Sequence, residues 1–208
     1  MEDCSKEVTC IPILMTSGTP CVLTSSSFPD LPYGKNNELI YDGVSRWSHN
    51  TSHLMGQVKT LGLLLLEKMV VVRGDIAEIT LGDTVILREK SVLRPPLRSV
   101  LNRNVAESTP VTVGSMTLIG RRVFSEAKSV GSFVLIEDEC VISEWVEVPD
   151  GVWLLSGSIV PSGVRLAPYV VYEGRPARPI ANVDAELHQI FMTERVNEVF
   201  SALMALSS

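Results

Sequence analysis

The C-terminal half of the chain repeats an apolar position every six residues. Seven of the eight positions in this column are Val, Ile or Leu: Val130, Ile136, Ile142, Val148, Leu154, Val160, Leu166 and Tyr172. The same pattern occurs earlier, at Leu81, Leu87 and Leu93 and again at Val113 and Ile119. The register slips by one residue between Ile119 and Val130, which predicts that one corner of the repeat is shortened.

A period of six fits neither an α-helix, with 3.6 residues per turn, nor a β-strand, with a period of two. It fits a short strand followed by a corner. Three such units make one triangular coil, and the next coil stacks on it at about 4.8 Å. The pattern therefore predicts an all-β fold, a parallel β-helix of hexapeptide repeats. We expect six column residues to be buried inside it: Ile136, Ile142, Val148, Leu154, Val160 and Leu166.

Glycine directly follows the column residue at Gly82, Gly114, Gly120 and Gly131. We expect glycine at such corners because some of them need a positive φ. The alternative fold is a β-sandwich whose strands are evenly spaced by accident. A doubly wound α/β fold fits the pattern less well still, because residues 113–177 leave no room for crossover helices.

Three segments depart from the repeat. Residues 1–40 have no period and are predicted to form an N-terminal extension before a β-helix over residues 41–180. Residues 97–110 interrupt the coils and are predicted to form a loop inserted at one corner. Residues 181–208 are predicted to hold a helix capped by Asp184, which either folds back on the coils or binds a partner. Its apolar stripe would consist of Met192, Val196, Val199, Leu203 and Leu206.

Charge and composition limit the classes of function and the cellular locations that fit the chain. The 208 residues carry a formal net charge of -6 and no basic run, so a nucleic-acid partner is not expected. The stretch from Leu61 to Leu66 is apolar apart from Gly62, but it is far too short to span a bilayer. The acidic start does not resemble a signal peptide, and we expect a cytoplasmic protein. Its four cysteines, Cys4, Cys10, Cys21 and Cys140, lack the paired spacing of a zinc site, and no cofactor is expected.

Several segments resemble the dynactin subunit 5 family, whose members are built on a left-handed β-helix. Arg73-Gly74-Asp75 follows a run of aliphatic residues, as it does in that family. The stretch from Ser91 to Arg94-Pro95-Pro96, with an irregular segment behind it, is similar to a family coil and its end. Val44-Ser45-Arg46 and the acidic segment at 136–141 also resemble family motifs.

This resemblance implies a non-enzymatic scaffold subunit in the pointed-end part of dynactin, which supports dynein cargo binding during microtubule-based transport. It implies partners among subunit 6, subunit 4 and the pointed-end actin-related protein, with dynein as an indirect partner, and a cytoskeleton-associated location. The candidate partner-binding residues are Arg73, Asp75, Arg94, Trp145 and Trp153. For Arg94 the alternative is that it only braces its own loop. The alternative for Trp145 and Trp153 is that they pack under the C-terminal helix.

Enzymes on the same fold are the competing hypothesis. A gamma-type carbonic anhydrase needs three histidines around zinc, and a hexapeptide acyltransferase needs a general base, usually a histidine on a coil. The histidines here are His49, His53 and His188, and the coils from Leu81 to Tyr172 contain none. The sequence therefore favours binding over catalysis, with no catalytic or metal-ligating residue expected.

Overall fold

The computed structural model describes residues 23–24, 38–41, 46–48, 51–100 and 105–205. The predicted extension over residues 1–40 lies largely outside these ranges. Within it the structure describes β1 (Leu23–Thr24) and β2 (Glu38–Tyr41). His49 and Leu206 also lie outside the described residues.

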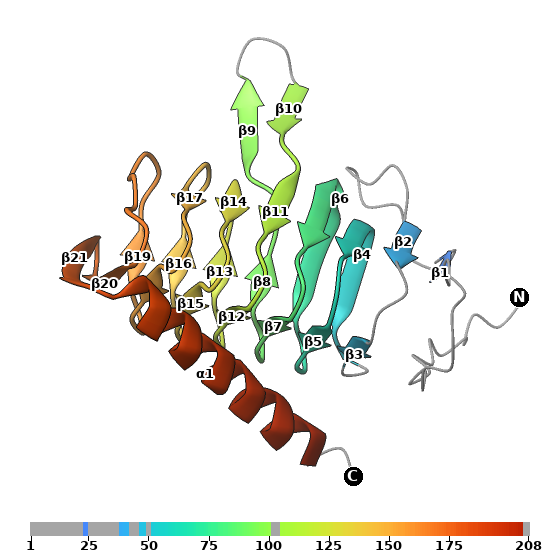
Figure 1. The fold of residues 1–208 in the computed structure, drawn as a ribbon. Coiled ribbons are helices and arrows are strands. Elements are labelled where there is room, and N and C mark those ends of the chain that lie inside the picture. The colour runs from blue at the N-terminus through green and yellow to red at the C-terminus, as the bar shows by residue number, and fades with distance from the viewer. Residues whose placement is uncertain (1–22, 25–37, 42–45, 49–50, 101–104, 206–208) are drawn as a thin grey trace, which may run out of the picture.

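The strands stack into three columns of parallel strands, which form the three faces of a solenoid (Figure 1). One face, called here the valine face, begins with the first halves of the long strands β4 (His53–Thr60) and β6 (Val71–Leu81). It continues through β8 (Val92–Leu93), β13 (Phe124–Ser125), β16 (Val141–Ile142) and β19 (Ile159–Val160).

The second face, called the polar face, contains the second halves of β4 and β6. It continues through β11 (Val111–Val113), β14 (Ser129–Val130) and β17 (Glu147–Val148). The third, called the helix face, stacks seven strands: β3 (Arg46–Ser48), β5 (Leu64–Leu66), β7 (Val85–Leu87), β12 (Thr117–Ile119), β15 (Leu135–Ile136), β18 (Trp153–Leu154) and β20 (Val170–Gly174). An antiparallel strand, β21 (Ala177–Asn182), pairs with β20 and ends the helix face.

The interior is the predicted column. Ile136, Ile142, Leu154 and Val160 are fully buried, and Val148 and Leu166 are at most 9% exposed, so this prediction is confirmed. The predicted register slip is also confirmed. Ser125 pairs with Leu93 and Ile142 and occupies the column position between Ile119 and Val130, so the shortened corner follows Ser125.

A ladder of side-chain hydrogen bonds runs along the corner between the polar and helix faces. In each rung a backbone N–H of one coil donates to a side-chain oxygen of the next. Leu63 N donates to Asp83 Oδ1 at 3.0 Å, and Asp83 N donates to Ser115 Oγ at 3.0 Å. Ser115 N then donates to Ser132 Oγ at 3.2 Å, and Ser132 N to Asp150 Oδ1 at 2.7 Å. Short polar residues at this corner therefore satisfy backbone groups that the strands leave unpaired.

The explanation predicted for the corner glycines is wrong. The positive φ values fall two residues later, on Thr84 (59°), Met116 (54°) and Phe133 (55°), none of which is glycine. The glycines are needed instead for close stacking of the coils. A Cβ built on Gly114 would lie 2.5 Å from the carbonyl carbon of Gly131 in the next coil, too close for any side chain.

The C-terminal helix α1 (Ala185–Ala205) crosses the helix face (Figure 1). Asp184 caps it as predicted, because Asp184 Oδ1 accepts hydrogen bonds from Glu186 N at 3.0 Å and Leu187 N at 3.1 Å. Its buried residues Met192, Val196 and Val199 pack on one row of outward side chains: Leu65, Ile86, Leu118 and Leu135. The described part of the stripe therefore folds back on the coils. Among the described residues, no helix has both the length and the apolar character needed to cross a bilayer.

The insertion predicted as a loop at residues 97–110 is in fact a β-hairpin, and that part of the prediction is wrong. Strands β9 (Leu97–Val100) and β10 (Val105–Ser108) pair antiparallel, with Val100 opposite Val105. The hairpin leaves the solenoid at the corner between the valine and polar faces and projects from it (Figure 1). It follows Pro95 and Pro96, which are both buried.

Candidate partner-binding surfaces

Arg73 and Asp75 face each other at the corner between the valine and polar faces. Arg73 Nε donates to Asp75 Oδ1 and Arg73 Nη2 to Asp75 Oδ2, each at 2.7 Å. The hydrogen bond to Asp75 holds the pKa of Arg73 above its ordinary value. Because Asp75 is buried, this bidentate pair satisfies a carboxylate that would otherwise be desolvated without a partner.

Arg94 lies one coil further along the same corner and links two coils. Its Nε donates to Glu126 Oε1 at 2.6 Å, and its guanidinium carbon lies 5.1 Å from the centre of the Phe124 ring. Phe124 and Glu126 belong to the following coil, so these contacts brace the solenoid rather than the hairpin that Arg94 precedes. A partly exposed edge of the guanidinium remains at the surface, where the hairpin begins.

We expect Arg94→Glu to lower the free energy of unfolding by about 1–3 kcal/mol, because the variant sets two carboxylates against each other where one is largely buried. Denaturant unfolding followed by circular dichroism measures this loss. The charge-swapped double variant Arg94→Glu with Glu126→Arg should recover most of it. A double variant no more stable than Arg94→Glu alone would show that the pair is not what stabilises this corner.

The two tryptophans differ in their surroundings. Trp153 stacks on Phe191 of helix α1 with ring centres 5.3 Å apart, and its Nε1 donates to Glu137 Oε1 at 2.8 Å. It therefore packs against the helix, which was the alternative left open by the sequence. Trp145 sits at a corner with a φ of 65° and is partly exposed.

A groove runs between helix α1 and the helix face. Its floor is apolar, formed by Leu118, Leu135 and Trp153, and its rim carries Glu137, Asp138 and Glu194 together with Arg88 and Arg195. Leu187 and Ile190 near the start of the helix are strongly exposed, at 69% and 58%. Sequence reasoning did not find this groove. The available signal was the apolar residue directly before each column residue on the helix face.

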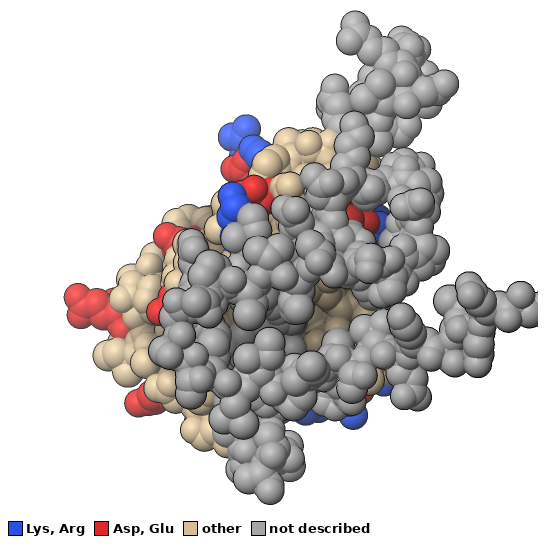
Figure 2. All heavy atoms as spheres, turned by 90° about the vertical axis from the view of Figure 1, so that its right-hand side faces the viewer, with Lys and Arg blue, Asp and Glu red and all other residues tan. Residues whose placement is uncertain are grey.

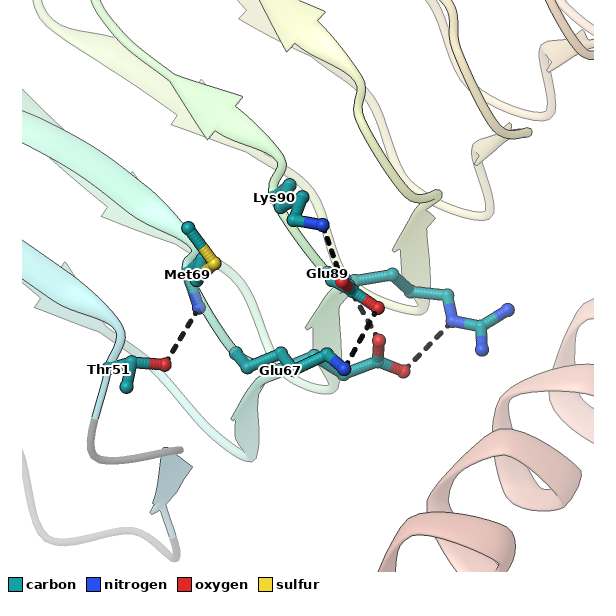
Figure 3. Close-up of polar contacts among 7 residues, drawn as sticks. Thr51, Glu67, Met69, Glu89 and Lys90 are labelled. Atoms are coloured by element: carbon teal, nitrogen blue, oxygen red, sulfur yellow. Dashed lines mark hydrogen bonds and ion pairs between the residues drawn. The ribbon is translucent and has the colours of Figure 1, made fainter.

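Charged residues also link coils at the corner between the helix and valine faces. Glu67 is buried and accepts hydrogen bonds from Arg88 Nε at 3.0 Å and from Glu89 N at 2.9 Å (Figure 3). Glu89 in turn forms ion pairs with Lys68 and Lys90. Seen along the solenoid from its N-terminal end, charged side chains of both signs stand at the periphery (Figure 2).

The residues that could support catalysis are dispersed. His188 is buried on helix α1, with its Nε2 2.8 Å from the carbonyl oxygen of Phe133, while His53 is exposed at the start of β4. Cys140 lies inside the solenoid, where burial raises the pKa of its thiol to about 11. Within the described ranges, no cluster of three or more His, Cys, Asp or Glu side chains could hold a metal ion.

Comparison with known proteins identifies the family. The sequence profile of the family described as "Dynactin subunit 5" matches residues 30–207. The chain belongs to the dynactin subunit 5 family. The match includes helix α1 and extends beyond the segments that carry the family motifs. No curated protein sequence matches the chain.

Two solved structures are similar to this chain. A hexapeptide transferase family protein from Anaplasma phagocytophilum is similar over 78% of this chain and 93% of its own, with a TM-score of 0.58 and 16% identity. A maltose O-acetyltransferase from Clostridium difficile 630 matches 69% of this chain and 68% of its own at 15% identity, with a TM-score of 0.39. At 16% identity the likeness to the Anaplasma phagocytophilum protein shows the fold alone, a left-handed parallel β-helix of hexapeptide repeats. Membership of the dynactin subunit 5 family implies association with other subunits of the dynactin complex.

Proposed function

We propose that this protein is a non-enzymatic scaffold subunit at the pointed end of dynactin, in the cytoplasm and associated with the cytoskeleton. The observation that carries the proposal is the family match over residues 30–207. Its direct partners would be subunit 6, subunit 4 and the pointed-end actin-related protein. Through them it would support dynein cargo binding on microtubules.

The arrangement of reactive side chains agrees with this role better than with acyl transfer or zinc catalysis. His188 already contacts a backbone carbonyl, and Cys140 is enclosed by aliphatic side chains. Neither has the exposed position that a general base or a nucleophile needs to reach a substrate. The transferase-like neighbours do not alter this, because one fold supports many unrelated activities.

The corner between the valine and polar faces is the proposed partner-binding edge. It carries Arg73 with Asp75, Arg94, Trp145 and the projecting hairpin. Arg73, Asp75 and Arg94 already have partners within the chain, so they would offer a fixed, rigid edge rather than free charges. Trp145 is partly exposed, and partly exposed aromatic residues are enriched at interfaces. Trp153 would contribute indirectly, by holding helix α1 in place.

We expect removal of the hairpin, with residues 98–108 replaced by a short Gly-Ser linker, to weaken dynactin assembly without unfolding the protein. The hairpin pairs with itself, so the coils on either side keep their hydrogen bonds. Affinity purification of tagged wild-type and variant proteins, followed by quantitative mass spectrometry, measures the recovered pointed-end subunits.

The control is thermal unfolding of the variant, which should differ from wild type by a few degrees at most. Full recovery of every pointed-end subunit by the hairpin variant would contradict the role of this edge. A wild-type protein that recovers no dynactin subunit would contradict the proposed function itself.

A further inference from the structure

Backbone hydrogen bonds join each coil of the solenoid to the next in a regular way. On each face the residue after the column residue donates its N–H to the following coil. On the valine face these donors are Arg94, Glu126 and Ser143, which bond to the carbonyl oxygens of Ser125, Ile142 and Val160 at 3.0, 2.9 and 2.9 Å. A donor at the same position of the last coil would lack a strand to bond to. Free strand edges of this kind are the places where a sheet pairs with another chain.

The valine face ends on a proline at the donor position. Val160 in β19 is the last column residue of this face, and Pro161 follows it. Because proline has no backbone N–H, the donor that the three preceding coils present at this position is missing. The ladder of this face therefore stops without an unpaired N–H after its last column residue.

The last donor of the polar face is bonded within its own coil. In the earlier coils the donors are Gly82, Gly114 and Gly131, which bond to the carbonyl oxygens of Val113, Val130 and Val148 at 2.7, 2.8 and 2.8 Å. The corresponding residue of the last coil is Ala167, which follows the column residue Leu166. Ala167 N donates instead to Tyr172 Oη at 2.7 Å, and Tyr172 is only 4% exposed. This donor is therefore satisfied inside the coil and is not available to another strand.

The helix face ends in a strand that turns back on it. Strand β21 pairs antiparallel with β20, with Arg178 opposite Glu173. The outer edge that results carries Pro179 and the exposed Arg178, and proline and charge on an edge strand both oppose further pairing. Next to this turn, Arg175 Nε donates to the carbonyl oxygen of Gly157 at 2.8 Å. An acceptor at the corner between the helix and valine faces is therefore satisfied as well.

We propose that the C-terminal end of the solenoid is closed to strand addition, so that a second copy of this chain cannot continue the stack there. The chain itself supplies every closing group: a proline on one face, a tyrosine hydroxyl on the next and a returning strand on the third. Partners can then bind only through side chains of the faces and corners, through the projecting hairpin or at the N-terminal end. The inference goes beyond the proposed scaffold function and holds whichever proteins bind those surfaces.

Pro161→Ala combined with Tyr172→Phe reopens the end. The first change restores a backbone N–H after Val160, and the second removes the acceptor of Ala167 N. We expect the double variant to self-associate with a dissociation constant at least about tenfold lower than that of wild type, because two donors gain partners in a second copy. Sedimentation equilibrium measures the difference.

Pro149→Ala is the matched control for the proline. Pro149 also follows a column residue directly, Val148, but it lies one coil before the end. This variant should self-associate no more than wild type does. A double variant that associates no more tightly than wild type would overturn the proposal, and so would a Pro149→Ala variant that associates as tightly as the double variant.

Hydrogen exchange followed by nuclear magnetic resonance tests the closure in single chains, and it needs only the conservative variant Tyr172→Phe. The amide of Ala167 should exchange slowly in the wild-type protein although the residue is exposed, because its N–H is bonded to Tyr172. Tyr172→Phe should speed this exchange at least about tenfold, while amides inside the ladder, such as that of Ser143, keep their rates. Equally fast exchange of Ala167 in both proteins would show that the end is open and would overturn the proposal.

Discussion

Ile142→Asp is expected to prevent the protein from folding. Ile142 is fully buried in the middle of the solenoid, between Ser125 of the preceding coil and Val160 of the following one. The substitution removes a large aliphatic side chain and leaves a carboxylate among apolar neighbours, so the loss should be about 5 kcal/mol or more. That is comparable to the whole stability of a typical domain. Yield of soluble protein and far-ultraviolet circular dichroism measure the outcome.

The neighbouring substitution Ser143→Asp is the control, because Ser143 is a partly exposed corner residue outside the column. It should express and unfold like wild type. Soluble, folded Ile142→Asp protein with an unchanged melting temperature would mean that the column does not form the core.

Gly114→Ala is expected to destabilise the protein by about 3 kcal/mol or more, although it adds a single methyl group. The new Cβ would lie 2.5 Å from the backbone of Gly131 and Ser132, which cannot move without separating two coils. Gly163→Ala is the matched comparison. Gly163 has a φ of 79° and no atom within 4 Å of its would-be Cβ, so only backbone strain of about 1–2 kcal/mol opposes that change.

Urea unfolding of both variants separates the two roles of glycine. The close-approach explanation requires Gly114→Ala to be the less stable variant. If Gly163→Ala were the less stable one, backbone conformation would matter more than coil spacing, as the sequence alone had suggested.

The repeat period was enough to predict the fold because each coil places the same residue type at the same interior position. Ile136, Ile142 and Leu154 could be assigned to the core without knowing what lay above or below them. Features that depend on contacts between coils were harder to predict. The corner glycines looked like turn residues because the steric conflict arises only with the following coil, which no local pattern reveals.

The candidate site was less predictable for the same reason. Arg94 could be placed at a corner, but its partner Glu126 is 32 residues away, because the hairpin enlarges one coil. The hairpin itself was predicted as a loop, since residues 97–110 have no alternation strong enough to indicate two strands.

The corner ladder has a consequence for the order in which the protein can fold during synthesis. In every rung the donor lies in an earlier coil and the acceptor in a later one. Leu63 N has no acceptor at this corner until Asp83 has been made, and Asp83 N has none until Ser115 has been made. A coil emerging from the ribosome therefore has an unpaired backbone N–H at this corner until the following coil has been made. The outward side chains of the helix face stay uncovered longer still, because Met192 and Val196, which cover them, are translated after every strand of that face.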